Sequence, residues 1–442
     1  METVLERYRR QHAKSAELYR QAQKVFPDGV THDTRYLLPF PVFITHAQGS
    51  RKWDVDGNEY VDYVMGHGAL LLGHSHPEIV AAVAAQVARG THLGGNTELE
   101  LRWAEWVRRL IPSAEKVRFT SSGTEATLMA MRLSRAFTGK SKVIKFTEHF
   151  HGWNDYALAG AMRGGGGIPS ATWSSMVVLP PNDISLVEKT LKEDRDMAAV
   201  ILEPTGAHFG RLPVYPQFLK DLGEVTRRYG VLLIFDEVVT GFRTSSGGAQ
   251  ARYGVRPDLT TMAKILGGGL PGGAVAGRAD VLDMIAHKEE PGWEQKRRVS
   301  HPGTFNANPL SAAAGSKCLE IVATQEPNGQ ADRMAQRLKD GINQVLARLE
   351  ISGHARGVAS VVHLDLGTDC ACDREVCTLP HERLSPPGPR AMALKRALLN
   401  AGVDLMGRGD FIVSAVHREG DIDRTIEGVE EALGALRGEG VV

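Results

Sequence analysis

Short apolar runs alternate with helix-like patterns between about residues 60 and 320. Apolar runs of a few residues between polar or glycine positions predict buried strands, and apolar positions three and four residues apart predict helices. Strands are predicted at Val117–Thr120, Val143–Phe146, Ala198–Leu202, Val231–Phe235 and Ala274–Ala276, and helices at Thr124–Phe137, Pro216–Tyr229 and Pro309–Ala323. This alternation predicts an α/β fold with a mostly parallel sheet and helices on both of its faces.

The two ends of the chain follow other patterns. Met1–Lys24 has the charged pattern of a surface helix, and the part after about residue 325 predicts a helix, short strands, a proline-rich loop and a last helix. We therefore expect a large domain over 61–322 and a smaller α+β domain over 323–442. The N-terminal segment 1–60 is expected to complete the smaller domain.

The balance of positive and negative residues bears on which partners the protein can bind. Lysine plus arginine and aspartate plus glutamate both number 52, so the net charge is zero. A neutral chain of ordinary hydrophobic content argues against a general nucleic-acid or acidic-membrane surface. No run of 18 apolar residues and no signal peptide is visible in the sequence. We expect a cytoplasmic protein that binds neither nucleic acid nor membrane.

Three of the four cysteines, Cys370, Cys372 and Cys377, lie close to His381 in the sequence. Four cysteines in a chain of this length do not indicate a disulfide framework, and the spacing is not the paired C-x-x-C of common zinc sites. We interpret the segment as a loop of reduced thiols that holds no metal. A structural zinc site is the alternative that the spacing leaves open.

The first candidate site is the segment Ser121–Ala126, which follows one predicted strand and opens a helix. The unpaired N–H groups and the dipole of a helix N-terminus favour an anion. Ser122, Gly123 and Thr124 are small enough to let a phosphate approach closely. The alternative is an N-cap with no ligand.

The second candidate is Asp236, at the end of the apolar run Val231–Phe235. An unpaired carboxylate buried there would cost several kcal/mol, so a partner is expected: a cation, a metal or a protonated ring nitrogen. Strand periodicity places Val238 on the same face as Asp236. Asp236 is thus suited to pair with a heteroaromatic nitrogen while Val238 contacts the face of the ring.

The third candidate is Lys264, which ends the segment Asp258–Ala263 and precedes the glycines Gly267–Gly269. A lysine at the end of a buried run loses hydration, and desolvation lowers its pKa toward that of a usable amine. A surface lysine at a strand end is the alternative.

These segments, taken in order along the chain, resemble the class III aminotransferases, a family that depends on pyridoxal phosphate. Within that family the resemblance is nearest to glutamate-1-semialdehyde 2,1-aminomutase and to β-amino-acid aminotransferases. It runs from about Trp53 to His417. The matching segments are Trp53–Gly57, Gly73–Pro77, Ser121–Ala126, Glu203–Pro204, Ile234–Arg243, Lys264 with Gly267–Gly269, Gly303–Pro309 and Ser414–His417.

The resemblance implies the fold of type I pyridoxal-phosphate transferases and a role for each matching residue. Lys264 would hold the cofactor as a Schiff base and then shuttle a proton between substrate and cofactor carbons. Asp236 would keep the pyridine nitrogen protonated, so that the ring accepts electrons. Gly123 and Thr124, together with Ser122, would bind the phosphate.

The resemblance also implies residues around the ring and a partner chain. Phe150 would stack on one face of the ring and Val238 would cover the other. His151 and Glu203 would lie among the cofactor contacts. Thr304 would bind the phosphate of a neighbouring subunit, which makes a homodimer part of the active site.

The substrate is less well defined by the sequence. The segment Pro27–Arg35 resembles the part of the aminomutase that ends in a carboxylate-binding arginine, so Arg35 is expected to bind a substrate carboxylate through two hydrogen bonds.

Two positions depart from the aminomutase pattern. His208 replaces an asparagine, and Arg408 resembles the arginine that β-amino-acid aminotransferases carry near the C-terminus. Two arginines would suit two carboxylate-bearing substrates. We therefore expect amino transfer from a β- or ω-amino acid to a 2-oxo acid, with the intramolecular aminomutase reaction, which gives 5-aminolevulinate, as the alternative.

Overall fold

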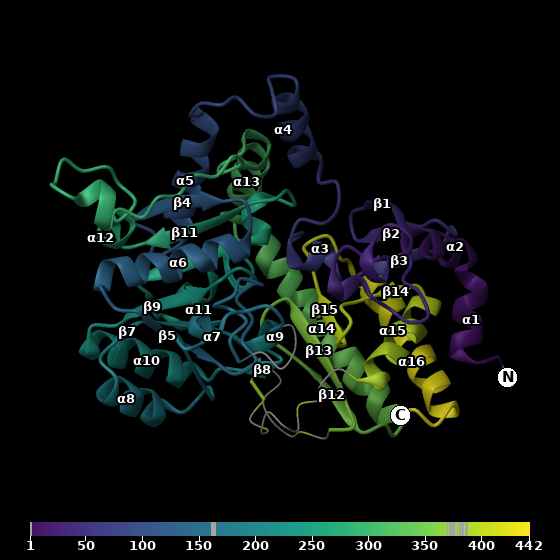
Figure 1. Cartoon of the computed structure of the whole chain (residues 1–442). Helices are drawn as coiled ribbons and strands as arrows, with labels where there is room; N and C mark the ends of the chain where they lie inside the picture. The colour runs from purple at the N-terminus through teal and green to yellow at the C-terminus, as the bar shows by residue number, and fades with distance from the viewer. Residues whose placement is uncertain are drawn as a thin grey trace. The chain divides into compact units, whose positions relative to one another are not determined.

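The computed structural model describes residues 2–160, 165–368, 370, 376, 377, 379, 384 and 388–442. Two compact units make up the chain (Figure 1). Unit 1 contains Met1–His76 and Glu326–Val442, and unit 2 contains Pro77–Gln325. Cys372 and His381, two of the four residues of the possible zinc set, lie outside the described residues.

Unit 2 is built around a seven-stranded sheet in the order β4-β11-β10-β9-β7-β5-β6. β11 is antiparallel to both of its neighbours, and the other pairings are parallel. The strands are β4 (Lys116–Thr120), β5 (Lys142–Phe146), β6 (Met176–Leu179), β7 (Met197–Leu202), β9 (Leu232–Asp236), β10 (Leu259–Ala263) and β11 (Gly273–Gly277), and a short β8 covers Leu212–Pro213. The mostly parallel sheet predicted from the sequence is confirmed.

Both faces of this sheet are buried, which explains why its strands are continuous apolar runs rather than alternating ones. Ile234 of β9 packs in a cluster with residues of α6 (Gly123–Thr138). Leu233 and Phe235, which point the other way, pack with residues of α8 (Ile184–Glu193) and α10 (Pro216–Tyr229). Figure 1 shows α6 on one side of these strands and α8 and α10 on the other.

Unit 2 contains further helices between and around its strands. They are α4 (Pro77–Val87), α5 (Glu98–Leu110), α7 (Ser170–Trp173), α9 (Ala207–Gly210), α11 (Gly248–Tyr253), α12 (Ala279–Leu282) and α13 (Pro309–Val322). Each strand and helix predicted within residues 117–323 is present, with its ends within one residue of the expected position. The helical pattern at Met1–Lys24 is instead divided between α1 and α2. β6 and β10 were not predicted as strands.

Unit 1 joins the two ends of the chain around a four-stranded sheet, β1-β2-β3-β14, and a three-stranded sheet, β12-β13-β15. Its strands are β1 (Ile44–Gln48), β2 (Arg51–Asp54), β3 (Glu59–Asp62), β12 (Gly353–Arg356), β13 (Val361–Leu366), β14 (Val403–Asp404) and β15 (Asp410–Ile412). Its helices are α1 (Val4–Gln11), α2 (Ala13–Ala22), α3 (Met65–Gly68), α14 (Glu326–Arg348), α15 (Pro389–Asn400) and α16 (Glu419–Gly438).

The N-terminal part of unit 1 is tied to the C-terminal part by backbone and side-chain contacts. β3 pairs in parallel with β14, so that Val61 lies opposite Val403. The sequence placed the first domain boundary near residue 60, whereas unit 1 extends to His76. No helix among the described residues is long and apolar enough to cross a lipid bilayer.

Candidate active site

The candidate residues of unit 2 follow the carboxyl ends of its strands. Asp236 is the last residue of β9, and Lys264 comes directly after β10. Ser122 follows β4, His151 follows β5 by a few residues, and Glu203 comes directly after β7. These five strands run in the same direction, so their carboxyl ends lie along one edge of the sheet, where open α/β sheets bind their ligands.

Asp236 is buried and receives three hydrogen bonds. The Nδ1–H of His151 donates to Oδ2 over 2.7 Å, and the Thr261 hydroxyl donates to Oδ1 over 3.1 Å. The backbone N–H of Val238 also donates to Oδ1, at 3.1 Å. This set of donors holds the carboxylate in one orientation and offsets part of the cost of its burial.

The imidazole of His151 is fully enclosed, and burial lowers its pKa, although the hydrogen bond to Asp236 acts in the opposite direction. A neutral ring with its proton on Nδ1 agrees with the donation to Asp236. Its Nε2 is buried and has no hydrogen-bond partner among the described residues. The site therefore contains a polar atom that the protein itself does not satisfy.

Lys264 has a backbone φ of 52°, in the left-handed region that side chains other than glycine seldom adopt. Burial lowers the pKa of its amine, while the nearby charges of Asp236 and Glu203 raise it. Residues with this left-handed backbone conformation cluster at functional sites, where the surrounding structure holds them in place. The net effect is an amine that gives up its proton more readily than a surface lysine does.

Glu203 is buried beside the same group of residues. Burial raises the pKa of its carboxyl group to about 8, and the charge of Asp236 adds to this shift. Its Oε1 accepts the backbone N–H of Phe150 over 2.8 Å, which links the segment after β7 to the segment after β5. Phe150 is 59% exposed.

α6 begins at Gly123, directly after Ser122, within the segment where the sequence predicted a helix N-terminus. Ser122 is its N-cap, and its hydroxyl accepts the N–H of Glu125. Gly123 and Thr124 are the first two helical residues, whose N–H groups have no acceptor inside the helix. The Thr124 hydroxyl accepts the N–H of Trp153 over 3.1 Å, so it also fixes the segment after β5.

Val238 lies next to Gly123, but not for the reason that the sequence suggested. β9 ends at Asp236 and Val238 lies in a turn, so the argument from strand periodicity was wrong. A Cβ atom on Gly123 would lie 3.1 Å from the Val238 methyl groups. The glycine is therefore needed for the start of α6 to approach the Val238 side chain.

Two other candidates of unit 2 have different surroundings. The imidazole of His208 lies 3.2 Å from the Glu148 carboxylate through Nε2, and its φ is 55°. Thr304 is exposed, and its carbonyl lies 2.6 Å from Nε2 of His92.

Arg35 and Arg408 both belong to unit 1, and they line different hollows. Arg35 is exposed, with its guanidinium 3.0 Å from the Thr31 hydroxyl, and it lines a cavity of about 460 Å³ together with Lys52 and Lys395. Arg408 lines a second cavity, beside the first turn of α15. The expectation that the two arginines act together is not supported by this placement.

Sequence reasoning missed Thr261. It donates to Asp236 because β10 is the parallel neighbour of β9 and the register sets Thr261 opposite Asp236. The order of strands in the sheet was needed to find it. A buried hydroxyl in the run before Lys264 was the only signal in the sequence.

The described residues fit pyridoxal phosphate on three observations. The start of α6 is an anion site of exposed N–H groups with the helix dipole behind it. The Val238 side chain lies next to Gly123 at the start of α6, so it offers an apolar surface to a flat ring bound there. The buried Nε2 of His151 and the buried Oγ1 of Thr205 lack partners among the described residues, as expected where polar groups serve a ligand.

Comparison with known proteins agrees with this geometry. The profile of the family "Aminotransferase class-III" matches residues 34–417. A glutamate-1-semialdehyde 2,1-aminomutase of Methanopyrus kandleri is 38% identical over 98% of this chain and 100% of its own length.

Two solved structures are similar over nearly the whole chain. An omega-transaminase from Sphaerobacter thermophilus superposes with a TM-score of 0.86 at 33% identity, covering 96% of this chain and 98% of its own. A transaminase with PLP bound superposes with a TM-score of 0.87 at 29% identity, covering 97% and 99%. The chain therefore has the type I fold and belongs to the class III aminotransferases, the enzymes whose cofactor is pyridoxal 5'-phosphate.

Proposed function

We propose that the enzyme moves an amino group within glutamate-1-semialdehyde and so produces 5-aminolevulinate. The observation that carries the proposal is the 38% identity to the M. kandleri aminomutase, which extends over all of that protein. This reverses the order expected from the sequence, in which two isolated departures at His208 and Arg408 favoured an intermolecular reaction. Sequence identity to the aminomutase along the whole chain is stronger support than the departures at His208 and Arg408.

The residues of unit 2 have the chemistry that this reaction needs. Bound pyridoxal phosphate supplies an electron sink for the carbanion formed at the amine-bearing carbon. Lys264, with its lowered pKa, would accept the proton from that carbon and pass it to the reacting carbon of the cofactor. Asp236 would hold a proton on the ring nitrogen, and His151 and Thr261 keep its carboxylate in place.

Phosphate and ring are held by the residues around α6. Ser122, Gly123 and Thr124 would bind the phosphate at the helix N-terminus, and Val238 would support one face of the ring. Phe150 covers the other face, and Glu203 fixes the backbone of Phe150.

Arg35 is proposed to bind the substrate carboxylate. It lines a cavity with Lys52 and Lys395, and both lysines form ion pairs with Asp404 there. Since the lysines are paired with acids, the exposed guanidinium of Arg35 is the group proposed to bind a substrate carboxylate.

The active unit is proposed to be a homodimer. Thr304 is exposed, and the resemblance gives this threonine a role at the phosphate of a neighbouring subunit. Thr304→Ala should weaken cofactor retention in the dimer while leaving Lys264 able to form its covalent link. Size-exclusion chromatography with light scattering measures the assembly, and a monomer that is fully active would contradict the proposal.

The experiment is a product assay on purified enzyme with glutamate-1-semialdehyde and no 2-oxo acid. We expect 5-aminolevulinate to accumulate catalytically, and Lys264→Ala to abolish it. The control adds pyruvate or 2-oxoglutarate, which should not increase the rate. Absence of the product from enzyme that has taken up its cofactor would reject the aminomutase.

The second candidate is transfer from a β- or ω-amino acid to a 2-oxo acid. The similarity to the S. thermophilus omega-transaminase and the presence of His208 and Arg408 favour it. A screen of β-amino acids against pyruvate and 2-oxoglutarate tests it. Turnover that requires both reactants would identify this reaction, and turnover of the semialdehyde alone would exclude it as the main activity.

A further inference from the structure

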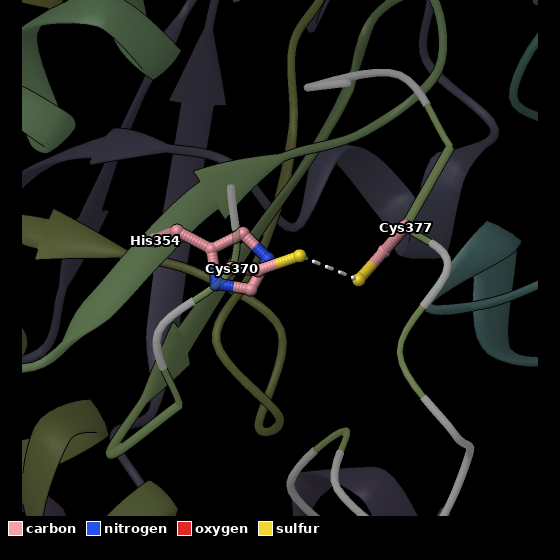
Figure 2. Close-up of side chains that lie close together, drawn as sticks. All are labelled: His354, Cys370 and Cys377. Carbon is pink, nitrogen blue, oxygen red and sulfur yellow. Dashed lines mark hydrogen bonds between the residues drawn. The ribbon is translucent and has the colours of Figure 1, made fainter. Parts of the chain in front are cut away.

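Three metal-binding side chains from different parts of the sequence meet in unit 1. His354, Cys370 and Cys377 each offer a ligand atom, and these three atoms all lie within 4.8 Å of one another. Figure 2 shows the imidazole and the two sulfur atoms directed toward one another. The geometry points to a zinc site in the reduced protein, with Nε2 of His354 and the Sγ atoms of Cys370 and Cys377 as three of its ligands.

The topology explains why a distant histidine joins the two cysteines. His354 belongs to β12, which pairs antiparallel with β13 so that His354 lies opposite Asp365. Cys370 and Cys377 follow β13 in the sequence, and their sulfur atoms lie beside the His354 imidazole. Sequence reasoning grouped the cysteines with His381, which is near them in sequence, and missed His354.

The separation of the sulfur atoms suits one shared ion. Sγ of Cys370 lies 3.4 Å from Sγ of Cys377. Two thiolates on one tetrahedral zinc, each about 2.3 Å from the metal, lie about 3.8 Å apart. The two side chains therefore need to move by only a few tenths of an ångström to bind the same ion.

The histidine is oriented as metal-binding histidines are. Its Nδ1 lies 3.1 Å from the carbonyl oxygen of Thr368, so Nδ1–H donates there and Nε2 carries the lone pair. The carboxylate of Asp365 is 4.0 Å from Nε2, beyond hydrogen-bond distance, and it accepts Nε–H of Arg356 over 2.9 Å. A backbone carbonyl thus selects the tautomer that leaves Nε2 to bind the metal.

The ligand types select the metal. Thiolates and imidazole are the usual ligands of structural zinc, whereas Mg²⁺ and Ca²⁺ take oxygen ligands. Two thiolates also cancel the charge of a divalent ion, which suits a cluster in which His354 and Cys377 are buried.

Metal binding requires both thiols. Cys377 is a free thiol, whereas Cys370 takes part in a disulfide. A dithiol reductant supplies two electrons and two protons, cleaves that disulfide and itself becomes oxidised to a disulfide. Zn²⁺ then displaces the protons of Cys370 and Cys377, so that two protons are released for each ion bound. The site is therefore controlled by the redox state of the chain.

The ion would fasten the segment after β13 to β12. The ion would link His354 to Cys370 and Cys377, which follow it by 16 and 23 positions, and a metal that closes such a loop restricts the unfolded chain. The first turn of α15 lines the cavity that contains Arg408. Zinc is therefore expected to stabilise unit 1 and this cavity, and to leave the cofactor site of unit 2 unchanged.

The first experiment uses the whole wild-type enzyme, reduced with a phosphine or a dithiol, passed through a chelator and then titrated with Zn²⁺ or Co²⁺. We expect about one ion per chain, release of protons on binding, and a thiolate-to-cobalt charge-transfer band. Oxidation should expel the ion. A reduced wild-type protein that binds no zinc and gives no such band would overturn the proposal and leave a thiol–disulfide exchange site.

The second experiment identifies the ligands. H354A, C370S and C377S should each lose nearly all bound zinc, and C318A, which removes a buried cysteine of α13 in unit 2, should keep it. Cofactor absorbance should be the same in all four variants, which shows that they are folded. Full zinc content in C370S and C377S, measured by mass spectrometry of the metal, would reject these ligands.

Discussion

Nδ1 of His151 lies 2.7 Å from Oδ2 of Asp236, although the two residues are 85 positions apart in the sequence. The hydroxyl of Thr261 holds the other carboxylate oxygen. A buried acid that is held from both sides cannot rotate away from its ligand, so its geometry is set before the cofactor binds.

Asp236→Ala should lower kcat by several orders of magnitude, because an unprotonated pyridine stabilises a carbanion poorly. Cofactor content, measured by visible absorbance, serves as the control, since an empty enzyme is inactive for a different reason. A loaded variant with only a mild loss of rate would contradict the role of Asp236.

His151→Phe should lower kcat by about 10- to 100-fold, because a hydrogen bond to a charged group contributes about 1.5–3 kcal/mol. KM should change little, since His151 acts through Asp236. An equal effect of H151F in the wild type and in Asp236→Ala, measured as a double-mutant cycle, would show that the two residues act independently.

Lys264→Ala should abolish turnover but should not lower the stability of the cofactor-free protein. The substitution removes a cation whose burial lowers its pKa, and such burial is unfavourable to folding. Melting temperatures of both proteins without cofactor provide the measurement. A large decrease in the variant would mean that the Lys264 side chain stabilises the fold.

Glu203→Gln should remove part of the pH dependence of stability. The folded protein raises the pKa of Glu203 from 4.5 to about 8, so the protonated form is favoured in the native state. Protonated Glu203 contributes fully to the free energy of unfolding below pH 4.5, and this contribution is lost as the pH rises to about 8. It amounts to roughly a few kcal/mol. The difference in melting temperature between E203Q and the wild type, both without cofactor, should grow in favour of the variant over this range. Parallel curves would show that Glu203 ionises normally.

Arg35→Ala should reduce kcat/KM for carboxylate-bearing substrates by about 10- to 100-fold, through loss of charge-assisted hydrogen bonds. Arg408→Ala is the matched control, because Arg408 lines a different cavity of the same unit. Arg35 does not bind the carboxylate if kcat/KM falls equally in both variants. The same conclusion follows if Arg35→Ala lowers kcat/KM as much for a carboxylate-free amine.

Much of the fold could be predicted because local signals agree with the final structure. α10 begins with Pro216 and ends before Gly230, which has a left-handed φ of 62°, and its predicted bounds are those observed. Pairing between strands carries no such local signal. The antiparallel course of β11 and the register that sets Thr261 opposite Asp236 depend on residues far apart in sequence.

The same division holds for the candidate sites. Asp236, Lys264 and Gly123 could be chosen from the sequence because each stands at the boundary of an element: Asp236 ends β9, Lys264 follows β10 and Gly123 begins α6. His354 could not be joined to Cys370 and Cys377, since a β-hairpin brings it there.

Unit 1 consists of the first 76 residues and the segment from Glu326 onward, with unit 2 between them. During synthesis β3 emerges early, yet its partner β14 follows only after unit 2 has been made. At ~5–20 residues per second this delay is on the order of tens of seconds. Unit 2 can fold first on the ribosome, while the edge of β3 that pairs with β14 stays open. The charged residues of β2 and β3 then oppose aggregation at this edge.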